Sequence, residues 1–191
     1  MEKTITREKI RALVETSLLI AIGFILSWIT RFIPMLTLPQ GGSVTPLSML
    51  PLLMIGLRHG LKWGLAGGFV YSGLQMLQQF WPPPSGTALA YISVVLLDYI
   101  FAFTVLGLSG LFRGKTNGII YAAPICIFLR FLCHFISGVV IWGEYAGAQA
   151  VWLYSLIYNG SYMGIELVVT TVVGIALCKT APTLFQLTTN N

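Results

Sequence analysis

The sequence has few charged side chains for its length. Asp, Glu, Lys and Arg make up 9% of the 191 residues, whereas soluble domains average roughly 25%. Hydrophobic residues reach 56%, and the mean hydropathy is +0.83. This scarcity of charge excludes an ordinary soluble domain. It predicts an all-α, multi-pass integral membrane protein, in the lipid bilayer of the plasma membrane.

The basic residues are not gathered into one patch. The net charge of +5 therefore does not indicate a nucleic-acid partner. Lys and Arg recur instead at the ends of apolar runs, which is the pattern that sets topology in membrane proteins.

Paired cysteines and catalytic motifs are missing as well. The three cysteines lie in apolar segments without a pairing or metal-binding pattern, so we expect neither a metal nor another cofactor. The chain has no HExxH, no P-loop and no nucleophile motif, and we do not expect an enzyme. An intramembrane enzyme that uses His134 with Asp98 or Glu144 is the alternative from that class.

Six apolar runs are candidates for membrane-spanning helices, each of which needs about 20 residues. They form one predicted domain over residues 1–191. The second run is short and contains two prolines. The runs are Leu13–Ile33, Val44–Leu57, Leu61–Leu77, Tyr91–Phe112, Ile119–Trp142 and Val151–Cys178.

The basic residues orient these six helices. They lie in the tail at residues 1–10, at Arg58 and Lys62, at Arg113 and Lys115, and near the C-terminal end. The positive-inside rule then places both termini in the cytoplasm. The two long outer connections, residues 34–43 and 78–90, are uncharged and rich in Pro and Gly. They are either ordinary turns with aromatic anchors or loops that cap an outward-facing pocket.

Three polar side chains fall at similar depths inside the apolar runs. Counting helical rise from the outer helix ends, Asp98 lies about 10 Å down, and His134 and Asn159 about 12 Å down. Polar groups at such depth usually face a protein interior or a water-filled cavity and mark a functional site. An interhelical hydrogen bond is the structural alternative for His134.

The residues around this layer suit a flat organic cation. Asp98 supplies a negative charge, and the amide of Asn159 both donates and accepts hydrogen bonds. Aromatic faces attract cations, although tyrosines near the outer surface are also typical of membrane interfaces. The aromatic candidates are Tyr99, Trp142, Tyr145, Tyr154 and Tyr158.

Two further features are predicted from position. Arg130 and Glu166 lie about 18 and 22 Å below the outer helix ends, and we expect them to form a buried ion pair that floors the pocket. Ser17 and Ala21 give the first helix a face of small residues, which suits a partner helix, whereas Gly64, Gly67 and Gly68 favour packing inside the protein.

Several motifs together resemble one family. They are Pro39-Gln-Gly-Gly-Ser43, Leu97-Asp98-Tyr99, Arg130-x-x-x-His134-x-Ile-Ser-Gly138 with Trp142, and Tyr154-Ser-Leu-x-Tyr-Asn159. This combination is similar to the thiamine-specific S component of energy-coupling factor (ECF) transporters, the membrane subunit that captures the vitamin.

The resemblance implies a six-helix fold and a role for each motif. It implies that Asp98 faces the positive charge of thiamine, with Tyr99 beside it and Arg130 beneath. Contacts with thiamine are implied for His134, Trp142, Tyr154 and Asn159, and further substrate-binding candidates are Trp81, Tyr91, Arg130, Glu144 and Tyr145. Ser17 and Ala21 would meet the transmembrane coupling subunit, which works with two ATPase subunits, so this chain itself would hydrolyse nothing.

The sequence departs from some relatives at three places. Gly42 stands where they carry an aromatic residue, Arg130 replaces a lysine, and Asp98 replaces a glutamate. An S component for another aromatic vitamin or a thiamine precursor is the alternative within this class. A facilitator that works without partners is the alternative outside it.

Overall fold

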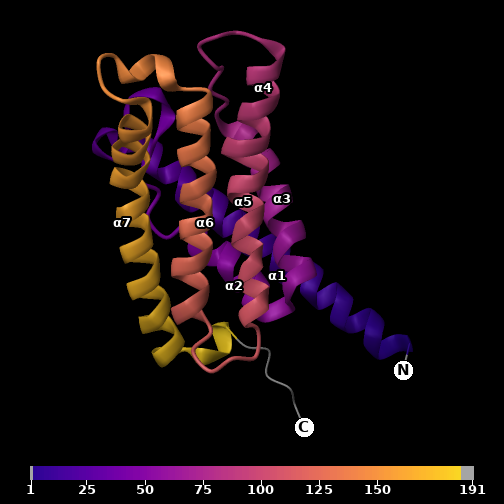
Figure 1. Ribbon diagram of the computed structural model, residues 1–191. Helices are drawn as coiled ribbons and strands as arrows, with labels where there is room; N and C mark the ends of the chain where they lie inside the picture. Colours follow the sequence, from indigo (N-terminus) through magenta and orange to yellow (C-terminus); the bar gives the residue numbers. More distant parts are fainter. Residues whose placement is uncertain (1, 186–191) are drawn as a thin grey trace.

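The computed structural model describes residues 2–185, in which helices run side by side (Figure 1). The α-helices are α1 (Glu2–Ile29), α2 (Met49–His59), α3 (Leu61–Gln78), α4 (Ala88–Val94), α5 (Ala102–Thr104), α6 (Ile119–Val140) and α7 (Val151–Thr180). A π-helical turn, Val95–Phe101, joins α4 to α5, and a 3-10 helix, Val105–Phe112, follows α5. Shorter 3-10 turns are Thr30–Phe32, Pro34–Leu36, Pro39–Gly41, Gly143–Ala146 and Pro182–Leu184.

The predicted all-α membrane fold is confirmed. Among the described residues, four helical stretches are long and apolar enough to cross a membrane: Arg7–Phe32, Ala88–Phe112, Ile119–Val140 and Val151–Thr180. The second predicted helix is short, as expected: α2 has 11 residues, about 16 Å at the usual rise. It begins at Met49 rather than Val44, because the chain first turns through Leu47, which has a positive φ.

Glycines bring the backbones of the middle helices into contact. A Cβ atom added to Gly107 would lie 2.2 Å from the carbonyl carbon of Gly64, and one on Gly110 would lie 2.4 Å from the Leu61 nitrogen. A Cβ on Gly68 would lie 2.6 Å from the Phe103 oxygen. Small residues permit such close approach. The predicted packing role of Gly64 and Gly68 is confirmed, and it fixes the helical stretch 88–112 against α3.

Two neighbouring residues of the π-helical turn, Asp98 and Tyr99, have partners on different elements. Asp98 bonds to residues at the outer end of α6, whereas the hydroxyl of Tyr99 donates to the Gln79 oxygen, just after α3. On a regular helix Tyr91 and Asp98, seven residues apart, would share one face. Tyr91 is instead 40% exposed and stacks on Phe80, and it does not line the cavity that Asp98 lines. The π turn starts at Val95 and changes the angular spacing between the two residues.

An ion pair connects α1 to the end of α2, and hydrogen bonds connect the end of α2 to the C-terminal segment. Glu15 accepts hydrogen bonds from Arg11 and Arg58, and Arg58 also donates to the carbonyls of Thr183 and Leu184. These contacts lie at the end of the bundle where α1 begins and α7 ends (Figure 1). Above them on α1, Ser17 and Ala21 lie on an exposed face, so their role as a partner surface stays a prediction.

Candidate ligand-binding site

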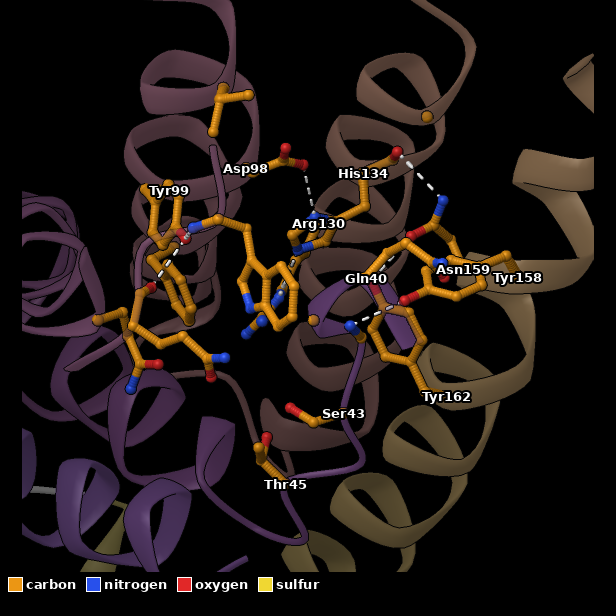
Figure 2. Close-up of a pocket in the computed structure, with 18 of the residues that line it drawn as sticks. Gln40, Ser43, Thr45, Asp98, Tyr99, Arg130, His134, Tyr158, Asn159 and Tyr162 are labelled. Carbon is orange, nitrogen blue, oxygen red and sulfur yellow. Dashed lines mark hydrogen bonds and ion pairs between the residues drawn. The ribbon is translucent and has the colours of Figure 1, made fainter. Parts of the chain in front are cut away.

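A cavity of about 140 Å³ lies between α1, α3, the stretch 88–112, α6 and α7, beside the first outer loop (Figure 2). One water needs only about 10–15 Å³ on the same measure, so the cavity has room for a small organic molecule. Of the predicted site residues, those lining it are Trp81, Asp98, Tyr99, Arg130, His134, Trp142, Tyr154 and Asn159.

The Asp98 carboxylate is held by three side chains. One oxygen lies 3.0 Å from His134 Nδ1 (Figure 2). The other accepts hydrogen bonds from Ser137 Oγ at 2.6 Å and from the indole nitrogen of Trp142 at 3.1 Å. The Asp98 side chain is only 16% exposed. These partners fix a negative charge in the cavity wall at a defined position, which is what recognition of a cation requires.

Asn159 is held almost as firmly. Its amide nitrogen donates to the carbonyls of His134 and Ser155, and its oxygen accepts from the Tyr162 hydroxyl at 2.8 Å. The approach of α7 to α6 depends on Gly138, where an added Cβ would lie 2.2 Å from Ser155 Oγ. Asn159 thus joins the two helices as well as lining the cavity.

The aromatic candidates divide into two groups. Tyr154 and Tyr158 stack with ring centroids 5.7 Å apart and line the cavity along with Trp142. Tyr145 stacks on the outer side of this group, 6.1 Å from Trp142, and is 44% exposed. Among the described residues, Tyr91, Glu144 and Tyr145 are not part of the cavity lining. The structure therefore does not bring these three predicted residues into the site.

The predicted ion pair between Arg130 and Glu166 is wrong. Within residues 2–185 no nitrogen of Arg130 lies within 4.0 Å of a Glu166 oxygen. Arg130 lies over the Phe103 ring, 4.1 Å from its centroid, and its Nε donates to His134 at 3.4 Å. The fully buried Glu166 instead accepts the backbone N–H of Thr45. Counting rise along two helices gives depth but not the distance across the bundle, and Thr45 occupies the position expected for Arg130.

The first outer loop packs against two aromatic residues. The Tyr158 hydroxyl accepts the Gly42 N–H at 2.8 Å and donates to the Pro39 carbonyl. Gly41 has φ +91° and lies so close to Trp81 that a Cβ would be 2.3 Å from the indole nitrogen. The positive φ of Gly41 favours glycine there, and a Cβ on Gly42 would lie 2.6 Å from the Tyr158 hydroxyl oxygen. The larger aromatic residue of some relatives at position 42 would collide here with Tyr158.

Sequence reasoning missed part of the cavity wall. This wall comes from the ends of α1 and α3, from the loops and from Tyr162 on α7, and its polar residues gave no depth signal. The missed residues include Ser27, Arg31, Gln40, Ser43, Thr45, Ser48, Gln75, Gln79 and Tyr162. Ser27 and Arg31 lie four residues apart, as do Gln75 and Gln79, and a sequence search for polar residues at helical spacing would have found both pairs.

Comparison with known proteins identifies relatives over nearly the whole chain. The family described as thiamine transporter protein (Thia_YuaJ) matches residues 13–186. The thiamine transporter ThiT of Bacillus subtilis is 34% identical over 189 residues, covering 91% of this chain and 93% of the relative. ThiT of Lacticaseibacillus paracasei is 35% identical over 151 residues, covering 72% and 74%.

The fold is shared with a solved structure. A structure of ThiT from Listeria monocytogenes superimposes with a TM-score of 0.76 at 24% identity and covers 94% of this chain and 99% of its own. The predicted resemblance is thereby confirmed, and the chain belongs to the thiamine transporter protein family.

Proposed function

We propose that this chain binds thiamine from the outer side of the membrane with high affinity, as the S component of an ECF-type importer. The observation that carries this proposal is the Asp98 carboxylate, fixed by His134, Ser137 and Trp142 in the wall of an aromatic-lined cavity. Thiamine is a flat organic cation, which such a charge and such rings attract.

The proposed topology has six membrane spans with both termini in the cytoplasm. The short helix α2 and the helix α3 are the two spans beyond the four long apolar stretches. The outer loops 34–43 and 78–90 then cap the cavity. Support comes from the lining residues Gly41, Gly42 and Trp81, which belong to these loops.

The proposed site residues are Asp98, Tyr99, His134, Trp142, Tyr154 and Asn159. Intrinsic tryptophan fluorescence of the purified protein tests binding directly, because Trp142 lines the cavity. We expect saturable quenching by thiamine that is strongly reduced in Trp142→Phe. Trp152→Phe is the matched control, because Trp152 is 56% exposed and lies outside the described lining.

Competition with other ligands separates thiamine from the alternatives. Free pyrimidine or thiazole fragments that compete as well as thiamine would favour a precursor as the substrate. Binding of riboflavin or biotin without binding of thiamine would overturn the proposal.

Energy for import is proposed to come from partners, a transmembrane coupling subunit that contacts Ser17 and Ala21 and two ATPase subunits. The relatives bear the names of transporters. Proteoliposomes that contain the chain alone should show no thiamine uptake, whereas addition of the partner subunits and ATP should restore it. Uptake by the chain alone would make it a stand-alone facilitator.

A further inference from the structure

We propose that Arg31, with Gln75 and Gln79, forms a second polar subsite in the same cavity, which binds the oxygen-bearing end of the ligand as an alcohol or its phosphate ester. This inference rests on the proposed function, because it concerns the side chain of the same ligand.

The subsite and Asp98 reach the cavity from different helices. Asp98 has its partners His134 and Trp142 on α6 and just beyond it. Arg31 lies in the 3-10 turn after α1, Gln75 lies in the last turn of α3, and Gln79 follows α3 directly. Helix α1 packs on α2 and α3, whereas α6 packs most extensively on α7. The cavity therefore has two walls of different chemistry.

The α1–α3 wall retains free hydrogen-bonding groups. Arg31 uses Nη1 to bond the Gln78 carbonyl at 2.9 Å, its one side-chain hydrogen bond within residues 2–185. A guanidinium has five N–H donors, so most of them remain for other partners. Gln75 donates to Ser27 at 2.8 Å, and the side-chain amide of Gln79 bonds to no other described residue. By contrast, the Asp98 carboxylate and the Asn159 amide are already bonded within the protein.

The charges of the two walls orient a cationic ligand. Asp98 attracts the positive ring, whereas Arg31 repels it and favours an oxygen with lone pairs. Guanidinium groups bind phosphate most strongly and also bond neutral oxygens. Thiamine carries a hydroxyethyl side chain, which is phosphorylated in its esters. We therefore assign that side chain to the subsite formed by Arg31, Gln75 and Gln79.

The test compares three ligands by calorimetry: thiamine, thiamine monophosphate, and the analogue with an ethyl group in place of hydroxyethyl. In the wild type, loss of the hydroxyl should weaken binding about tenfold or more, the range for a hydrogen bond to a charged group. Arg31→Gln should remove most of this difference. Gln79→Leu, which breaks none of the described hydrogen bonds, should reduce it less and decides the question if Arg31→Gln does not fold.

The monophosphate identifies which oxygen the subsite takes. Tighter binding than thiamine that is lost in Arg31→Gln assigns the subsite to the phosphate ester, and weaker binding assigns it to the alcohol. Arg11→Gln, at the opposite end of α1, is the matched control and should bind all three ligands like the wild type.

Two results would overturn the subsite. Equal affinity of the wild type for thiamine and its ethyl analogue would show that the oxygen is not recognised. An equal loss for both ligands in Arg31→Gln would show that Arg31 only holds the end of α3. A wild type that binds no thiamine contradicts the proposed function itself, so the two failures are distinct.

Discussion

At the scale of single residues, the position of Asp98 is set by its neighbours on α6. His134 and Ser137 lie three residues apart on one helical face, and both bond to the carboxylate, one to each oxygen. The His134 ring accepts a hydrogen bond from Arg130, and the His134 backbone carbonyl accepts one from the Asn159 amide. A substitution at any of these positions should therefore change the position of the Asp98 carboxylate.

Asp98→Asn removes the charge and keeps the shape of the side chain. We expect thiamine affinity to fall by about 2–5 kcal/mol, or roughly 30-fold to several thousand-fold, because a partly buried charge pair is lost. Titration of tryptophan fluorescence measures the change. Glu144→Gln makes the same chemical change at an exposed residue outside the described lining and should leave affinity unaltered. If both variants bind like the wild type, Asp98 does not face the cation.

At the scale of elements, the site depends on how closely the stretch 88–112 approaches α3. Gly107→Val would push a side chain into the backbone of Gly64, with its Cβ only 2.2 Å from a carbonyl carbon. We expect a loss of about 1–3 kcal/mol of stability, as for other overpacked cores. A lower thermal unfolding midpoint in detergent measures it.

Gly73→Val on α3 provides the comparison, because a Cβ there has nothing within 4 Å. Its midpoint should stay near that of the wild type, since valine is slightly better than glycine in a helix. Equal midpoints for the two variants would mean that the glycine contact does not hold these helices together.

At the scale of the whole molecule, the orientation in the membrane is open to direct measurement. In a background without the native cysteines, Ser85→Cys lies in the second outer loop and Lys115→Cys in the connection before α6. We expect a membrane-impermeant maleimide to label the first in intact cells and the second only after permeabilisation. The reverse pattern would invert the predicted topology.

Helix positions and residue depths along the helices could be predicted from the sequence, but the directions of the side chains could not. Hydropathy placed the helices, and helical rise placed Asp98, His134 and Asn159 in one layer; all three line the cavity. The helical rise alone did not reveal that Tyr91 lies outside the cavity lining. The π-helical turn changes the residue spacing locally, and the pattern of apolar residues in the sequence does not predict such a turn.

The sequence by itself determined the membrane location, the order of the helices and the polar layer, because these depend on local hydropathy and on a fixed rise per residue. Only the tertiary structure decided that Glu166 bonds Thr45 instead of Arg130, and that Arg31 and the end of α3 complete the cavity wall. Which residues meet across the bundle depends on the rotation and spacing of each helix. Glycine contacts and the π-helical turn set these, and they bring together residues far apart in the chain.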